Sequence, residues 1–511
     1  MRWVLILVLA GCGRCEPEPT VAAETMPTDA IELPTPDLRL VFLTDVKGYL
    51  EPCGCTSAPL GGIDRMRHRL RQLESEAPTL FAAAGDLFFG NESHAGPASL
   101  EADQWQAETL VRILDEAGLD AATPGALDAA RPDALLALVE LARFPILASG
   151  WTLGEHGFDA ATTTELGGVR VQIVGITDGL PSAEANIPSA EDAALRVLLA
   201  RGDRRDARAW SELDADFLVL GGIDREEPAP PSERHATWTL QGGRQGQGLL
   251  VVDLYRPRAE GAWQDLSQWT LDARRTALDA QIDELETQLE RWRAEGEHDE
   301  SDLQRQARRL ESLRSERRSM RAPAFPETGR VFAARWEPLE HDLPGDPATR
   351  RILETLDVRI NDHNREAFAD RQPPPVSEGQ PHYVGSDACA GCHAEAHAWW
   401  RSHPHGRAYA TLETRNKQFH LGCVGCHVTG YERPGGSTVT HLLDGALRDV
   451  GCEVCHGAGS AHVASPGTSD IARETDERLC IACHNEEHSD LFQYEAYRAT
   501  LLVPGHGRPA D

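Results

Sequence analysis

The sequence predicts a layered α/β domain in its first half and a domain of short helices and loops in its last quarter. Three observations predict this class. Apolar runs of strand length alternate with amphipathic helical stretches up to residue 256. A leucine-rich helical pattern follows, and the last quarter holds eight of the twelve cysteines. Because 511 residues are too many for one core, several domains are expected.

The first half alternates strand and helix patterns. Buried strands are expected at residues 38–43, 79–84, 145–148, 169–176 and 217–220. Amphipathic helices are expected at residues 64–76, 104–117 and 132–142. This alternation predicts sheets covered by helices over residues 37–256.

Several short motifs in this half follow the order found in a known family. They are Leu43-Thr-Asp45-Val-Lys47-Gly48 with Glu51-Pro52, Gly61-Gly62-Ile-Asp-Arg65, Ala84-Gly85-Asp86-Leu87, Phe144-Pro-Ile-Leu-Ala-Ser149, Val174-Gly-Ile-Thr177 and Gln241-Gly-Gly-Arg-Gln-Gly-Gln-Gly248. On these motifs the segment resembles the periplasmic 5′-nucleotidase-type metallophosphoesterases. The resemblance implies a calcineurin-like phosphoesterase-type sandwich and a site for two metal ions.

Most metal ligands of that family are replaced in this chain. Asp45 and Asp86 remain, whereas Lys47 stands where the family has a histidine. The Asn-His-Glu and Gly-His-x-His runs of the family correspond to Ala126-Leu127-Asp128 and Gly222-Ile223-Asp224-Arg225. The remaining ligands predict a vestigial site without a metal ion. An ion pair of Lys47 with the two carboxylates is expected in place of a cation.

A Cys-x-Cys motif, Cys53-Gly54-Cys55, follows the first aspartate loop. With its surroundings it resembles phosphatase-like exported proteins in which the first cysteine position can be selenocysteine. A disulfide between such close cysteines closes a small, strained ring and is easily reduced. Three interpretations stay open: a redox pair, a soft-metal site, and a passive loop disulfide in an oxidising compartment.

Residues 257–326 have a different periodicity. Their apolar residues repeat at 4-3-4-3 spacing: Leu278, Ile282, Leu285, Leu289 and Trp292. A second stripe follows, so an antiparallel helical hairpin is expected, either closed on itself as an insertion or serving as a dimerisation arm. Residues 327–370 are expected to return to the first domain as a strand and a helix, and residues 371–381 form a linker.

The last quarter repeats the motif Cys-x-x-Cys-His four times. The motifs are Cys389-Ala-Gly-Cys392-His393, Cys423-Val-Gly-Cys426-His427, Cys452-Glu-Val-Cys455-His456 and Cys480-Ile-Ala-Cys483-His484. Two sulfurs at this spacing can bond to the vinyl groups of a porphyrin, and the next histidine gives its imidazole to the iron. Zinc knuckles and disulfides are the alternatives, but neither requires a histidine after every second cysteine. Four covalently bound c-type haems are therefore predicted.

Further residues extend the pattern over residues 382–511. They are Tyr383-Val-Gly-Ser386, Trp400-Arg-Ser-His-Pro-His405-Gly-Arg-Ala408, Cys426-His-Val-Thr-Gly430, Gly451-Cys-Glu-Val-Cys-His-Gly457, Ser460-Ala-His462 and His506-Gly. On these residues the region resembles the tetrahaem cytochrome c554 family, in which one haem can lack a distal ligand. The resemblance implies His405, His462 and His506 as distal ligands.

The number of histidines agrees with two axial ligands for most haems. Thirteen of the 20 histidines lie in this region, which leaves nine beyond the four proximal ones. His403, His420, His441 and His488 are weaker distal candidates than the three that the resemblance implies.

The N-terminus carries an export pattern. Residues 4–10 form an apolar run that is too short to cross a bilayer, and it ends in Leu9-Ala10-Gly11-Cys12. This resembles a bacterial lipoprotein signal peptide (residues 1–11) that places Cys12 on lipid, ahead of a tether over residues 12–36. Plain secretion is the alternative. A periplasmic location is expected, and Gly13 favours the outer membrane.

Composition narrows the function. A net charge of −31 argues against nucleic acid as a partner. The first hypothesis is electron transfer by a lipid-anchored tetrahaem cytochrome, with a periplasmic or membrane redox partner. The second is an oxidoreductase that uses an open haem or the Cys53/Cys55 pair, and the third is an active phosphoesterase fused to a cytochrome.

Overall fold

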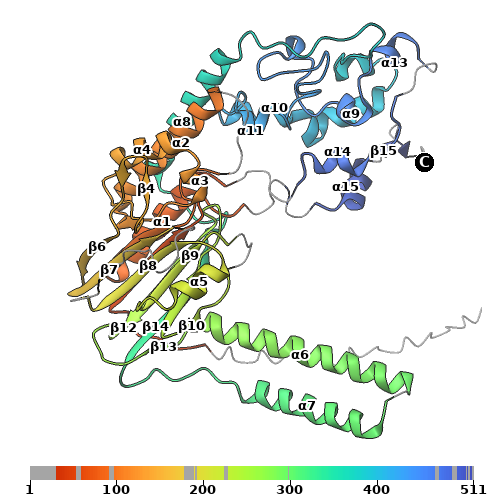
Figure 1. Ribbon diagram of the computed structural model, residues 1–511. Coiled ribbons are helices and arrows are strands. Elements are labelled where there is room, and N and C mark those ends of the chain that lie inside the picture. The colour runs from red at the N-terminus through yellow and green to blue at the C-terminus, as the bar shows by residue number, and fades with distance from the viewer. Residues whose placement is uncertain are drawn as a thin grey trace, which may run out of the picture.

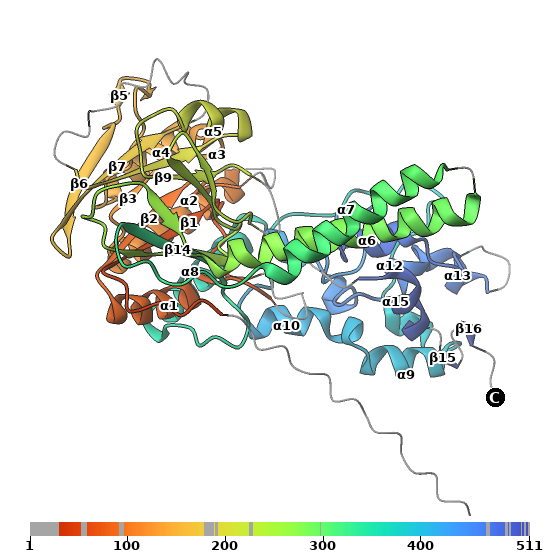
Figure 2. The ribbon, with the colours of Figure 1, turned by 90° about the horizontal axis from the view of Figure 1, so that it is seen from below.

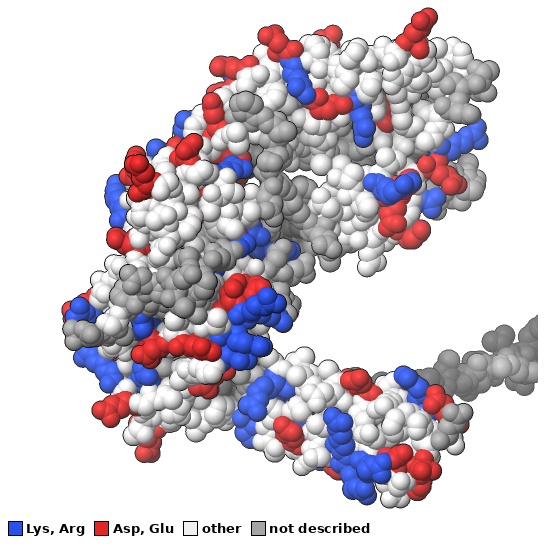
Figure 3. Space-filling view, in the orientation of Figure 1, with Lys and Arg blue, Asp and Glu red and all other residues white. Residues whose placement is uncertain are grey.

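The computed structural model contains a layered α/β domain, a projecting helical hairpin and a C-terminal domain of short helices (Figure 1). It describes residues 30–52, 59–90, 97–177, 189, 193–223, 228–296, 298–466, 471–485, 489, 492–501, 503–504 and 507–508. The hairpin and the C-terminal domain both project from the α/β domain. A view from below shows them on the same side of it (Figure 2). Acidic and basic side chains are interspersed over the face that Figure 3 shows.

The first sheet has six strands in the order β13-β14-β12-β1-β2-β3. Their bounds are β1 (Leu38–Thr44), β2 (Thr79–Ala84), β3 (Ala121–Ala122), β12 (Gly248–Tyr255), β13 (Trp263–Asp265) and β14 (Arg330–Pro338). Strand β1 runs parallel to β2 and antiparallel to β12, with Leu38 opposite Leu254. Strand β14 lies between β12 and β13, so the expected return strand is confirmed.

The second sheet also has six strands, in the order β10-β11-β9-β8-β7-β6. Their bounds are β6 (Ala161–Leu166), β7 (Val169–Ile176), β8 (Leu195–Arg201), β9 (Phe217–Gly221), β10 (Ser232–Arg234) and β11 (Thr237–Gln241). Strands β7, β8, β9 and β11 are parallel neighbours. Two small ladders, β4 (Thr152–Leu153) with β5 (His156–Gly157) and β15 (Val503–Pro504) with β16 (Gly507–Arg508), complete the described strands.

The two sheets pack face to face between layers of helices. Because successive side chains of a strand point to opposite faces, Leu40 and Phe42 of β1 enter the core between the sheets, whereas Val41 and Leu43 pack under helices. Strands buried on both faces appear in the sequence as continuous apolar runs. The predicted calcineurin-like sandwich is confirmed as a layered arrangement.

Helices cover both outer faces of the sandwich. Their bounds are α1 (Ile63–Glu76), α2 (Pro97–Ala117), α3 (Ala126–Ala129), α4 (Pro132–Leu141), α5 (Arg204–Trp210) and α8 (Pro347–Ala367). The core under α1, α2 and α8 is the larger one, and Trp210 of α5 is buried on the second sheet. The strand expected at residues 145–148 is wrong, because Ile146 and Leu147 make only single bridges with Ala122 and Asp159.

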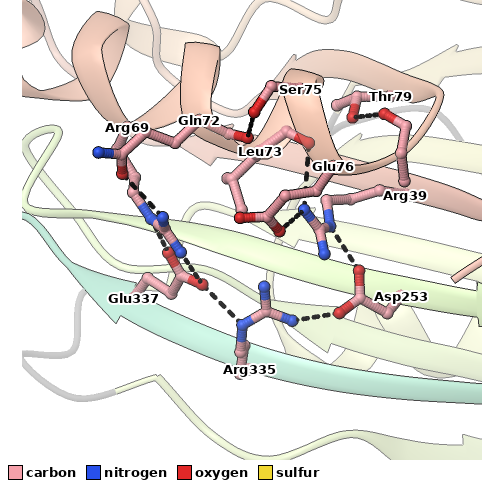
Figure 4. A network of polar contacts seen from close by, with 11 residues as sticks. Arg39, Arg69, Gln72, Leu73, Ser75, Glu76, Thr79, Asp253, Arg335 and Glu337 are labelled. Carbon is pink, nitrogen blue, oxygen red and sulfur yellow. Dashed lines mark hydrogen bonds and ion pairs between the residues drawn. The ribbon is translucent and has the colours of Figure 1, made fainter. Parts of the chain in front are cut away.

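A chain of charged side chains fastens α1 to the first sheet (Figure 4). Arg39 of β1 donates to Asp253 of β12 at 2.5 Å and to the carbonyl of Leu73 near the end of α1 at 3.1 Å. Asp253 also pairs with Arg335, whose Nε lies 2.6 Å from Glu337. The Arg39 side chain is only 4% exposed. Its partners therefore have to offset the cost of burying its charge.

The helices α6 (Gln268–Glu295) and α7 (Glu300–Ser319) form the expected antiparallel hairpin. A small cluster joins them, with Leu285, Leu289 and Leu310 buried at its centre. Helix α6 ends at Gly296, which adopts the left-handed conformation typical of a C-cap (φ 67°). The two helices therefore pack on each other, which confirms the expected hairpin.

The C-terminal domain consists of short helices and loops. Their bounds are η1 (Ser386–Cys389), α9 (Ala394–Ser402), η2 (Pro404–Arg407), α10 (Ala408–Thr414), α11 (Leu421–Val424), η3 (Leu443–Gly445), α12 (Cys452–His456), α13 (Ser460–Ala464), α14 (Glu477–Ile481) and α15 (Tyr494–Leu501). The largest cluster of buried apolar residues found in this domain has five members: Tyr409, Val424, Val428, Val439 and Leu442. In the described part of the chain, no helix combines the length and apolar character needed to cross a bilayer.

Replacing Asp253 by alanine removes the carboxylate between two arginines. We expect the variant to lose about 3 kcal/mol of stability, because the Arg39 guanidinium stays buried with less compensation. Hydrogen–deuterium exchange of the β1 and β12 amides measures the change. The control is Asp362→Ala, which breaks an exposed pair with Arg365 and should cost less than about 0.5 kcal/mol. Equal effects of the two substitutions would contradict the structural role of the buried network.

Candidate functional site

Each Cys-x-x-Cys-His motif lies on a short helical turn. In the first motif the His393 N–H donates to the Cys389 carbonyl at 2.9 Å, and in the fourth the His484 N–H donates to the Cys480 carbonyl at 2.8 Å. One turn places residues three apart on the same side, so both thiols of a motif face one space. None of the eight motif thiols, all of which the structure describes, forms a disulfide, and seven of them are only partly exposed.

The motifs approach one another in an interleaved order. The thiols of Cys389 and Cys452 are hydrogen bonded, and this bond raises the pKa of Cys389 and lowers the pKa of Cys452 to about 6. The thiols of Cys426 and Cys483 are hydrogen bonded in the same way, which raises the pKa of Cys483. The first motif therefore contacts the third, and the second contacts the fourth.

Two histidine pairs stand at the distance that a metal ion between them requires. The ring centres of His393 and His462 are 6.4 Å apart, and those of His405 and His484 are 6.1 Å apart. An imidazole nitrogen binds a metal at about 2 Å, and the ring centre lies about 1 Å further out, so two axial imidazoles have centres about 6 Å apart. Both pairs join a motif histidine to a predicted distal histidine. The residues present thus fit a haem iron with two imidazole ligands.

The protonation of the motif histidines suits metal binding. Nδ1 of His427 lies 2.7 Å from the Ala408 carbonyl, and Nδ1 of His456 lies 2.6 Å from the Ala472 carbonyl. Because a carbonyl only accepts, Nδ1 carries the proton and Nε2 keeps its lone pair. Burial lowers the pKa of His405 to about 4, so this imidazole is neutral near pH 7.

Some predicted residues lie elsewhere or outside the described residues. Cys12, Cys53, Cys55, His488 and His506 are not among the described residues. His403 stacks on Trp399, and its Nδ1 accepts from the His405 N–H at 3.2 Å. His420 Nδ1 accepts from the Gly422 N–H at 3.3 Å.

The aspartates of the α/β domain gather at the carboxyl ends of β1 and β2. Asp45 accepts from the backbone N–H groups of Asp86 at 3.1 Å and Gly222 at 2.8 Å. Asp86 accepts from the Leu127 N–H at 2.8 Å. A side chain on Gly85 would place its Cβ 2.3 Å from the Asp45 carboxylate, so only glycine fits between the two aspartates.

Asp128 is the most deeply buried carboxylate of this cluster. Its two oxygens accept from the N–H groups of four residues at 2.9–3.0 Å: Leu87, Phe88, Phe89 and Gly125. Burial raises the pKa of Asp128 to about 7, although these hydrogen bonds act in the opposite direction. Burial also raises the pKa of Asp45 to about 6.

The ion pair at this cluster differs from the expected one. Asp86 pairs with Arg201 at 3.4 Å, from the end of β8. Lys47 acts on Asp45 through its charge, and its backbone N–H donates to the Asp86 carbonyl at 2.9 Å. Among the residues that the structure describes, no group of three or more His, Cys, Asp or Glu is arranged to hold a metal ion.

A partly buried lysine connects the two domains. Lys417 Nζ pairs with Glu51 of the α/β domain and lies 3.5 Å from Asp357 of α8. Burial raises the pKa of Asp357 to about 7, against the lowering effect of Lys417. Cys423 follows Lys417 by six residues and is near enough to influence its pKa, so the second motif lies close to this junction.

Two asparagines of α8 continue the junction. The Asn361 side chain accepts from the Phe419 N–H at 3.0 Å, and the Asn364 side chain donates to the Phe419 carbonyl at 3.0 Å. Both backbone groups of one residue are thus held by the α/β domain.

The repeated motifs with their paired imidazoles have the thiol and imidazole arrangement that c-type cytochromes use to hold haem. Residues 388–457 match the family described as cytochrome c554 and c-prime, which implies covalently bound c-type haem. Cytochrome c-554 of Nitrosomonas europaea is 30% identical over 92 residues, which cover 15% of this chain and 39% of that protein. The chain thus spans well under half of this curated relative.

Solved structures similar to this chain include a sulfate thiohydrolase and a nucleotidase. The sulfate thiohydrolase SoxB of Thermus thermophilus is 14% identical, with a TM-score of 0.41 over 71% of this chain and 68% of that one. A 5′-nucleotidase precursor, also of Thermus thermophilus, is 13% identical, with a TM-score of 0.41 over 80% of this chain and 73% of that one.

The raised pKa of Asp128 predicts a pH dependence of stability. An aspartate that binds its proton more tightly when folded contributes stability at low pH and loses it as the pH rises through about 7. Between pH 5 and 8 this loss should be on the order of 2 kcal/mol. Asp128→Asn cannot titrate, so its stability should decrease less over the same range, whatever its absolute value. Hydrogen exchange of the β2 amides at both pH values measures the difference, and parallel pH profiles for variant and wild type would contradict the assignment.

Proposed function

We propose that this chain is a tetrahaem c-type cytochrome that transfers electrons outside the cytoplasm. The observation that carries the proposal is the spacing of the two imidazole pairs, 6.4 and 6.1 Å between ring centres, each including a motif histidine. Bound haem supplies one-electron redox chemistry. Each of the four motifs holds one haem by two thioethers and one imidazole.

The chain sets the order of the haems by its own contacts. Cys389 is hydrogen bonded to Cys452, and Cys426 is hydrogen bonded to Cys483. Haems attached through these sulfurs would therefore be close neighbours, the first of the third and the second of the fourth. His462 and His405 serve as distal ligands, and His506 is proposed for a third haem. Haems held by motifs that lie this close would let electrons pass from one motif to the next.

The α/β domain is proposed to position a partner and not to hydrolyse phosphate. The carboxylates of Asp45, Asp86 and Asp128 are occupied by backbone N–H groups, and Arg201 supplies a positive charge beside them. A periplasmic or membrane redox partner is proposed, with no nucleic acid. Lipid on Cys12 would anchor the chain, and Gly13 favours the outer membrane.

Spectra of the holoprotein test the ligand assignment. We expect four haems per chain, and we expect His462→Ala and His405→Ala each to convert one haem from low spin to high spin. His382→Ala is the control and should leave the spectrum unchanged, because the His382 side chain is exposed and only its backbone groups bond to Ser460. Electron paramagnetic resonance of the oxidised protein counts the low-spin haems. Absence of covalent haem from the wild type would refute the proposal.

A second candidate function is an oxidoreductase that uses Cys53 and Cys55. The observation that favours it is the junction, because Glu51, two residues before Cys53, pairs with Lys417 beside the second haem motif. Oxidation of the two thiols to a disulfide would release two electrons and two protons, and two ferric irons would accept one electron each.

Removal of the two thiols distinguishes an electron carrier from an oxidoreductase. For a carrier, we expect Cys53→Ser/Cys55→Ser to take up electrons from dithiothreitol at the wild-type rate, because the haems alone conduct. Stopped-flow absorption of the haem bands measures the rate, with Cys15→Ser as the control for the loss of a thiol. A slower reduction in the double variant alone would favour the oxidoreductase.

A further inference from the structure

The third haem motif contains a buried carboxylate. Glu453 follows Cys452 directly and is 2% exposed. The corresponding positions of the other motifs are Ala390, Val424 and Ile481, which carry no charge. A charge that is buried this deeply needs hydrogen-bond partners. The partners of Glu453 therefore show which segments it connects.

Backbone N–H groups from two segments surround the Glu453 carboxylate. Oε2 accepts from Gly385 at 2.7 Å, and Oε1 accepts from Gly459 at 2.7 Å. The Val384 N–H contacts both oxygens, at 3.0 and 3.1 Å. One carboxylate therefore connects a segment before the first motif with a segment after the third.

Each of these segments leads directly to one histidine of a pair. Gly385 is the N-cap of η1, which opens the first motif and leads to His393. Gly459 is the N-cap of α13, which carries His462. The two rings are 6.4 Å apart with an interplanar angle of 27°. Glu453 thus contacts the start of both elements that present the pair.

A second set of hydrogen bonds keeps the two segments in register. The His382 N–H donates to Ser460 Oγ at 2.9 Å, and the Ser460 N–H donates to the His382 carbonyl at 3.1 Å. Gly385 has a positive φ of 85°, and a Cβ there would lie 2.6 Å from the Ala446 carbonyl oxygen. The backbone at this point is therefore specific for glycine.

We propose that Glu453 is a positioning residue that sets the spacing of His393 and His462 across the first haem. The inference rests on the proposed function, because it concerns the ligands of that haem. A carboxylate suits the role since both of its oxygens accept hydrogen bonds. Glutamine would turn an NH₂ group toward an N–H donor, and aspartate would draw the oxygens back by one methylene.

The experiment compares holoprotein of the wild type with Glu453→Gln, Glu453→Asp and Glu395→Gln. Glu395 is exposed and lies two residues from His393, so its substitution is the matched control. We expect every variant to keep the wild-type haem content, because all thiols remain. Glu453→Gln should lose the low-spin signal of one haem, Glu453→Asp should lose part of it, and the control should lose none.

Added imidazole distinguishes a displaced ligand from a collapsed domain. Imidazole from solution should restore the low-spin signal of Glu453→Gln, as it should for His462→Ala, because an open coordination position accepts it. If Glu453→Gln does not fold, Glu453→Asp, which keeps the carboxylate, is tested for the same loss of low-spin signal and its restoration by imidazole.

Three results would overturn the inference, and they differ from a failure of the proposed function. Wild-type low-spin signals in Glu453→Gln and Glu453→Asp would show that Glu453 does not position the ligands. A high-spin signal that imidazole leaves unchanged would mean a general loss of structure. Haem lost from the third motif alone would give Glu453 a role in attachment. Wild-type protein without haem would instead remove the proposed function itself.

Discussion

The fold of the C-terminal domain is constrained by its small apolar core, because its polypeptide buries little apolar surface of its own. The main apolar cluster in its described part has five buried residues, from Tyr409 to Leu442. The core under α1 and α2 alone is several times larger. Helices of four to nine residues are too short to be stable without tertiary contacts. Porphyrins bonded to these thiols would supply both the missing apolar surface and cross-links between distant segments.

The α/β domain shows how a phosphoesterase-like scaffold is stable with few metal ligands. Its aspartates lie where parallel strands end, which is where ligand sites occur in such sheets. In this chain the carboxylates accept hydrogen bonds from Gly222, Leu127 and the backbone around Phe88. Arg201 adds a positive charge next to Asp86. Backbone N–H groups and one guanidinium thus offset part of the cost of the buried negative charge, while burial still raises the pKa of Asp45 and Asp128.

The sequence predicted the features that depend on local patterns. Continuous apolar runs revealed β1, β2 and β7, since strands buried on both faces have no polar side. Residues 145–148 have the same composition but make only single bridges, because no neighbouring strand extends along them. The motif itself predicts the proximal histidines, because covalent spacing would fix their position.

Features set by distant residues could not be predicted in the same way. The family resemblance named His405 and His462, but which motif histidine each one faces depends on how four helical turns assemble. Arg201 was missed because only the sheet brings the end of β8 next to Asp86. Glu453 was missed as well, although a charge inside an otherwise apolar motif was a visible sign.

The interleaved order of the motifs limits how this domain arises and evolves. The first motif touches the third and the second touches the fourth, while His405 faces His484 across nearly the whole domain. A cut between the second and third motifs would separate all of these contacts. The domain is therefore not a sum of two halves that fold separately. A nascent chain would likewise complete its first contact between motifs only after the third motif has been synthesised.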